Sequence, residues 1–116
     1  MKYILLAYAD EQRLAAMSSG DRAALRNACL ASDEALRASG HLLAALDLQD
    51  SRAATTLRVQ HSDVSIFVGP YAGTAEQLIG IFTIEARDLN EAIRVAATMP
   101  QIRGGPIEVR PLAEFD

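Results

Sequence analysis

The chain has one cysteine and no long run of basic or apolar residues, and each absence excludes a class of protein. Cys29 alone cannot form an intrachain disulfide, and with two scattered histidines it offers no zinc-ligand spacing, so no metal is expected. The formal net charge is −4 and lysines and arginines stand singly, which disfavours DNA or RNA as a direct partner. No stretch approaches membrane-spanning length and no secretory cleavage pattern follows Lys2, so we expect a cytoplasmic protein without a membrane partner.

Common cofactor and catalytic motifs are also missing. There is no Walker motif, no dinucleotide fingerprint and no Ser-His-Asp order, and Gly104-Gly105 precedes a strand pattern, whereas a phosphate cradle opens a helix. We therefore expect no cofactor. What remains is 116 residues, half of them apolar, which is the size and composition of one globular domain over residues 1–116.

Hydrophobic periodicity predicts an alternation of strands and helices. Residues 2–9 form an apolar run typical of a strand buried on both faces, and a short helical turn is expected over residues 11–17. A long helix is predicted over residues 21–39, with Ser18 or Ser19 as N-cap and Gly40 after its end. Further strands are predicted over residues 41–48, 55–60, 64–68, 76–86 and 107–110, and a second helix runs from the Asp88 cap to Met99 before Pro100.

This order predicts an α+β, ferredoxin-like sandwich with both main helices on one face of an antiparallel sheet. Alternation along the strands separates two faces. The second face is mixed, which favours a partner-covered polar cavity over an open solvated face. The face expected against the helices holds Leu57, Val59, Phe82, Ile84, Ile107 and Val109, and the second face holds Thr56, Arg58, Ile81, Thr83, Glu85, Glu108 and Arg110, with Tyr3 or Tyr8 among them.

Residues 68–82, VGPYAGTAEQLIGIF, resemble the signature of the DGPF (DGPFAETKE) branch of the YCII-related superfamily. The positions that match are Gly69, Pro70, Ala72, Thr74, Glu76, Gln77, Leu78 and Gly80. Three charged signature positions differ and are Val68, Gly73 and Ala75 here. The opening MKYILL, the segment ATTLRV at residues 54–59 and the closing EVRP are also similar to family strands, so the resemblance spans the chain.

The resemblance implies a ferredoxin-like fold that pairs two copies through their sheets into a dimeric α/β barrel. It also implies an acid/base pair in superfamily enzymes, a histidine on the first long helix and an aspartate before a proline after the second. Cys29 and Met99 stand at or near those positions here, which leaves open whether the protein is an enzyme.

Two residues are weak catalytic candidates. Cys29 lies on the apolar stripe of the long helix, where a buried inert thiol is favoured over a nucleophile. Glu76 is the best single carboxylate for binding or proton transfer, and a surface charge or intersubunit salt bridge weighs equally. His41 is expected to cap helix carbonyls or face solvent, and His61 to lie exposed in a hairpin turn.

Seven residues are predicted to bind a ligand. Arginines suit anionic or carbonyl groups, although pairing of Arg58 and Arg110 with Glu85 and Glu108 across the sheet is favoured over ligand binding. Tyr71 offers a ring wall and a hydroxyl. The predicted ligand-binding residues are Tyr8, Arg58, Gly69, Pro70, Tyr71, Glu76 and Arg110.

Three functions follow as hypotheses. The first is a cytoplasmic homodimer that binds a small polar or anionic metabolite in a cavity at the sheet and dimer interface. The second is a cofactor-independent lyase or isomerase, of the dehydrochlorinase kind, that uses Glu76, an arginine and Cys29. The third, from family association alone, is an accessory interaction protein linked to sigma-factor regulation.

Overall fold

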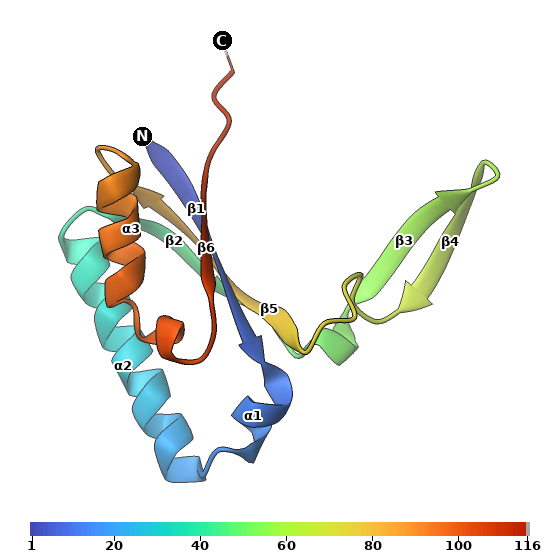
Figure 1. The fold of residues 1–116 in the computed structure, drawn as a ribbon, viewed down its shortest axis with the longest axis horizontal. Coiled ribbons are helices and arrows are strands. Elements are labelled where there is room, and N and C mark those ends of the chain that lie inside the picture. The colour runs from blue at the N-terminus through green and yellow to red at the C-terminus, as the bar shows by residue number, and fades with distance from the viewer. Residues whose placement is uncertain (116) are drawn as a thin grey trace.

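A computed structural model describes residues 1–115. Four strands form an antiparallel sheet in the order β2-β5-β1-β6, and a separate two-stranded hairpin, β3-β4, projects from it as an arm (Figure 1). The elements are β1 (Lys2–Asp10), α1 (Glu11–Ala16), α2 (Ser19–Ala38), β2 (Leu42–Asp47), the short 3-10 turn η1 (Ser51–Ala53), β3 (Thr55–Gln60), β4 (Asp63–Val68), β5 (Glu76–Glu85), α3 (Leu89–Thr98), the 3-10 turn η2 (Pro100–Arg103) and β6 (Ile107–Pro111).

The four-stranded sheet with α2 and α3 has the ferredoxin-like layout, so the predicted α+β fold is confirmed. Strands β1, β2, β5 and β6 are its four strands in sequence, and the arm is an insertion in the connection between β2 and β5. The predicted caps are also found. Ser18 Oγ accepts from the Asp21 amide at 3.1 Å, and Asp88 Oδ1 accepts from the Glu91 amide at 2.9 Å.

The core lies between the helices and one face of the sheet. Odd-numbered residues of β1 point into it beside Phe82 and Ile84 of β5, and Val95 of α3 packs against them. Of the even-numbered residues of β1, Lys2 is exposed and the others are only half-buried, so the expectation that this strand is buried on both faces is wrong for the single chain. No helix in the described residues covers that second face.

The uncovered face of the sheet is apolar at its centre and charged along β6. Cross-strand pairing places Leu46 beside Ile81 and Ile81 beside Leu6, with Ile4 two residues before Leu6 on the same face. Leu46 is 59% exposed. Glu108 and Arg110 pair with Leu6 and Ile4 and complete this face at the β6 edge. Tyr8 follows on the same face of β1, and we call Ile4, Leu6, Tyr8, Leu46, Ile81, Glu108 and Arg110 the open face.

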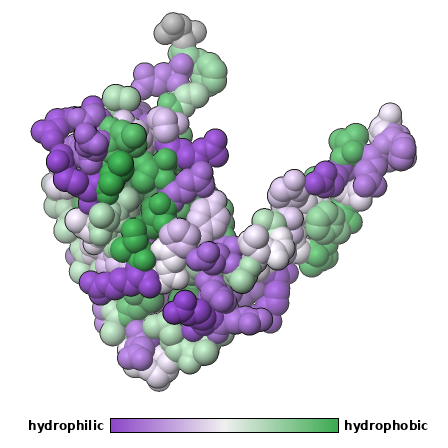
Figure 2. All heavy atoms as spheres, in the orientation of Figure 1, coloured by the Kyte–Doolittle hydropathy of each residue, from purple (hydrophilic) through white to green (hydrophobic). Residues whose placement is uncertain are grey.

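The arm corrects a second expectation. Leu57 and Val59 were expected against the helices, but β3 does not join the main sheet, and these two side chains are exposed. In the part of the chain that the structure describes, β3 and β4 pair only with each other. Figure 2 shows apolar side chains along the projecting arm, clear of the rest of the molecule. His61 and Ser62 form the tight turn at its tip with positive φ angles of 51° and 71°.

Charged residues also pair differently from the expected cross-sheet network. Glu85 Oε1 lies 2.9 Å from the N-terminal amine, and Glu108 Oε2 lies 3.9 Å from Arg110 Nε along the same strand. Arg58 lies on the arm, away from both carboxylates, because its strand is outside the sheet. The predicted pairing of these four residues across the sheet is therefore wrong.

Candidate functional site at the base of the arm

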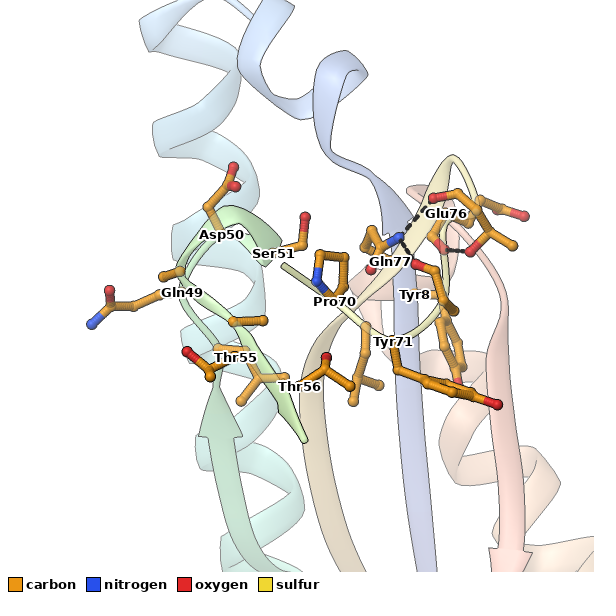
Figure 3. A pocket seen from close by; sticks show the side chains of 16 residues that line it. Tyr8, Gln49, Asp50, Ser51, Thr55, Thr56, Pro70, Tyr71, Glu76 and Gln77 are labelled. Carbon is orange, nitrogen blue, oxygen red and sulfur yellow. Dashed lines mark hydrogen bonds between the residues drawn. The ribbon is translucent and has the colours of Figure 1, made fainter. Parts of the chain in front are cut away.

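A hollow of about 670 Å³ lies where the arm leaves the body. Figure 3 shows Tyr8 and Tyr71 toward one end of it, Pro70 in the middle, and Asp50 and Gln49 toward the other end. Tyr8 comes from β1, and every other wall comes from the inserted segment and the start of β5. The lining residues are Tyr8, Leu48–Ser51, Ala53–Thr56, Pro70–Ala72, Thr74 and Glu76–Leu78.

The loop over residues 69–75 owes its shape to residues of the recognised motif. Gly69 has a φ of 130°, a conformation that residues with a Cβ rarely adopt. The Gln77 side-chain amide donates to the carbonyls of Ala72 and Thr74, both at 2.7 Å. The Thr74 hydroxyl donates to the Glu76 carbonyl at 2.7 Å. These motif residues therefore build one wall of the hollow through backbone contacts.

The arm is fixed to the body at its base by side chains. The Glu11 carboxylate accepts from the Ser51 amide at 2.8 Å and from the Ser51 hydroxyl, which joins α1 to η1. The Thr56 hydroxyl donates to the Gly69 carbonyl at 2.8 Å, which joins β3 to the loop. The hollow thus has a defined position between arm and sheet.

Tyr8 connects the hollow to the open face. Its hydroxyl donates to Glu108 Oε1 at 3.3 Å, and Glu108 in turn faces Arg110. Burial raises the pKa of the Tyr8 hydroxyl, and the charge of Glu108 raises it further. Tyr8 is therefore a neutral hydrogen-bonding group at ordinary pH. It is not a base.

The charged groups of the hollow are carboxylates. Asp50 and Glu76 are the charged residues among its described lining, which includes no arginine or lysine. Asp50 Oδ1 accepts from Arg52 Nε at 2.9 Å, and this hydrogen bonding lowers the pKa of the Asp50 carboxyl. Arg58 stands just outside the lining, with its guanidinium carbon 5.0 Å from the centre of the Tyr71 ring, a cation–π distance. The lining is therefore mostly apolar, and its charged groups are acidic, with Asp50 already paired to Arg52.

Comparison with known proteins gives this architecture a family. The family model for the YCII-related domain matches residues 1–116. The chain belongs to the YCII-related family. An uncharacterized protein of Rhizobium meliloti (strain 1021) is 32% identical over 117 residues, which cover 99% of this chain and 94% of that relative.

In this YCII-related protein, Cys29 and Met99 lie apart from the hollow. Met99 is 1% exposed and packs in the core at the end of α3. Cys29 is half-buried on α2, where burial raises the pKa of its thiol and the nearby Asp33 and Asp47 carboxylates raise it further. A raised pKa keeps the sulfur protonated, which fits the inert thiol and disfavours the nucleophile.

The structure brings together four of the seven predicted ligand-binding residues. Tyr8, Pro70, Tyr71 and Glu76 line the hollow, and Gly69 shapes it from the adjoining position. Arg58 contacts Tyr71 but does not itself line the hollow. Arg110 is connected to the hollow only through Glu108, which it faces and which accepts the hydrogen bond from Tyr8. Their binding roles stay predictions. Lining residues outside the seven predicted ones include Gln49, Asp50, Ser51, Thr55, Thr56 and Gln77, of which the sequence had named Thr56 only for the second face and Gln77 only as a motif position.

The remaining residues of interest serve the fold. His41 Nδ1 is 2.7 Å from the Ser39 hydroxyl and its Nε2 is 3.5 Å from Glu91, so it links the end of α2 to the start of α3. His61 is exposed at the arm tip, as predicted. Within residues 1–115, no cluster of three potential metal ligands is found, and no helix is long and apolar enough to cross a membrane.

Proposed function

We propose that this protein is a homodimer of the DGPF branch of the YCII-related family and binds a small polar metabolite in the hollow at the base of the arm, in the cytoplasm and as a single domain. The observation that carries the proposal is the hollow itself, which gathers an aromatic wall and several polar groups next to the open face. Its volume of about 670 Å³ falls within the roughly 300–1,000 Å³ of small-molecule sites.

The lining favours a neutral polar ligand over an anionic one. Glu76 repels an anion and the charge of Asp50 is already paired with Arg52, whereas the oxygens of both carboxylates accept hydrogen bonds from hydroxyl or amide groups. Tyr71 is exposed and offers a ring face for an apolar or planar part of the ligand. The ligand class that fits is a small neutral compound with several hydrogen-bond donors and one flat surface.

The open face supports the dimer. A central patch of aliphatic side chains on a sheet face without a helix cover is the kind of surface that a partner buries. Tyr8 lies on that face and also lines the hollow, so a second copy seated there would enclose the ligand. Enclosure would raise affinity because it removes water from the hydrogen bonds in the hollow.

Catalysis is the second candidate, on one observation. Glu76 and Tyr8 line the same hollow and bring a carboxylate, which can accept a proton, and a neutral hydroxyl to one site. Cys29 has no part in such a site because it lies outside the lining.

Thermal unfolding in the presence of a panel of small neutral and anionic metabolites tests the binding proposal. A neutral polar compound that binds the hollow should stabilise the protein by about 2.7 kcal/mol when its free concentration is 100 times its Kd. Tyr71→Ala should abolish that shift, and Tyr71→Phe should retain the part due to the ring. The proposal fails if each stabilising compound acts equally on wild type and Tyr71→Ala.

A further inference from the structure

The arm is a ribbon with one apolar and one polar face, and its apolar face lies in solvent. Leu57 pairs with Ile66, and Val59 pairs with Val64, on one face of the ribbon, with Val68 at its base. These five side chains are 59% to 81% exposed. The other face is polar apart from Phe67 at its base, and its polar residues are Thr56, Arg58, Gln60, Asp63 and Ser65.

This asymmetry calls for a partner. An isolated two-stranded hairpin is at best marginally stable in water and needs a further packing surface. The arm nevertheless keeps an unbroken register of six pairs from Thr55–Val68 to Gln60–Asp63. Five aliphatic side chains together on one solvent-exposed face form an apolar patch, and such patches mark surfaces that a partner covers.

We propose that the apolar face of the arm packs against a second copy of this chain, so that the two copies exchange arms and each seals the hollow at the base of the other's arm. This inference rests on the homodimer proposed above and assigns the arm as its clasp. The two-fold symmetry of such a dimer makes every contact occur twice.

The area of the arm fits the requirement of a stable dimer. Complete burial of a Val, Leu or Ile side chain removes roughly 60–120 Å² of apolar surface from water. Because the five arm side chains are 59% to 81% exposed in the single chain, they still offer about 300 Å² per copy. Each copy gives one arm and receives one, which brings the arms to about 600 Å² per copy, against about 800 Å² per partner in a standard interface. The open face supplies the remainder.

The hollow lies between the two surfaces that the partner would cover. Tyr8 belongs to the open face, whereas Thr55 and Thr56 belong to the arm, and all three line the hollow. A second copy in contact with both surfaces therefore passes over the mouth of the hollow. The hollow is partly open to solvent in one chain, so the site is incomplete without the second copy.

The test is the oligomeric mass of two charge variants on opposite faces of the arm. Ile66→Glu places a carboxylate on the apolar face. Ser65→Glu places the same group at the preceding residue, on the polar face and opposite Arg58. Because symmetry applies each change twice, Ile66→Glu should raise the dimer dissociation constant at least about 100-fold in sedimentation equilibrium. Ser65→Glu should leave it within about 3-fold of wild type.

Hydrogen exchange supplies the second measurement on the same proteins. The arm amides should be protected in the wild-type dimer and exchange fast in Ile66→Glu, while the core strand β1 stays protected in both. The inference is overturned if Ile66→Glu dimerises as wild type does, if both variants dissociate equally, or if the arm exchanges fast in the wild-type dimer. A wild-type monomer at micromolar concentration would instead overturn the homodimer of the proposed function.

Discussion

Gly105 should be the most sensitive glycine in this protein, because its Cα touches the central strand. A Cβ at this position would lie 2.0 Å from the Tyr8 carbonyl oxygen and 2.9 Å from the Tyr8 carbonyl carbon. Both atoms are backbone of β1, which is held on its two sides by β5 and β6. Gly105→Ala therefore cannot be accommodated by rotation of a flexible side chain.

The cost of Gly105→Ala follows from what must move. The loop before β6 has to retreat by more than about 1 Å to restore ordinary contact, which breaks the hydrogen bond from the Tyr8 amide to the Pro106 carbonyl, now 3.0 Å long. Overpacking costs about 1–3 kcal/mol and the lost bond about 1 kcal/mol. We expect a loss of about 3 kcal/mol in the free energy of unfolding.

Urea unfolding of Gly105→Ala and Gly104→Ala measures this effect against a matched control. The nearest atom to a Cβ on Gly104 is 3.7 Å away and its φ of −94° suits alanine, so Gly104→Ala should stay within about 0.5 kcal/mol of wild type. The midpoint of Gly105→Ala should fall by about 1.5 M for a slope of about 2 kcal/mol/M. Equal midpoints for the two variants would refute the steric argument.

Four further predictions concern single side chains. Asp88→Ala should cost about 1 kcal/mol in urea unfolding, because it removes the acceptor that caps α3. Gln77→Ala should speed limited proteolysis of the loop over residues 69–75, since two carbonyls lose their donor. Cys29 should react with a thiol reagent more slowly than free cysteine at pH 8, because its raised pKa leaves less thiolate. The hydrogen bond from the Arg87 amide holds the pKa of the Glu91 carboxyl below its ordinary value. The stabilisation from this carboxylate is therefore complete above the ordinary carboxyl pKa and is lost as pH falls through the lowered one, and this acid-dependent loss should be absent from the unfolding profile of Glu91→Gln.

Element types and bounds could be predicted because local signals fix them. Asp88 and Ser18 mark helix starts through side-chain hydrogen bonds, and Pro100 marks a helix end by restricting the backbone of the residue before it. The observed ends differ from the expected ones by at most two residues. The α+β layout followed from the order of elements alone. These features depend on neighbours within a few positions along the chain.

The position of the arm could not be predicted, because alternation has the same form in any strand. Leu57 and Val59 alternate with Thr56 and Arg58 whether their apolar face meets a helix layer or another chain. The sequence therefore placed them in the core, and only the strand pairing shows them outside it. Their apolar character is explained by the arm's proposed contact with a second copy.

The site was predicted in part for a related reason. Residues of the motif, such as Tyr71 and Glu76, were found because they stand together in the sequence. The walls from Asp50, Ser51 and Thr56 reach the same hollow only through the return of the inserted segment, which no local pattern encodes. The close approach of Gly105 to β1 could not be predicted either, because it joins residues far apart in the sequence and a glycine in a loop carries no local signal of it.

Native mass spectrometry of gently purified protein tests the central claim most directly, because one spectrum reports both assembly and a retained ligand. We predict a species at twice the 12.5 kDa chain mass that carries an additional small molecule, and loss of that molecule in Tyr71→Ala with the dimer intact. A bare monomer at micromolar concentration would contradict the account.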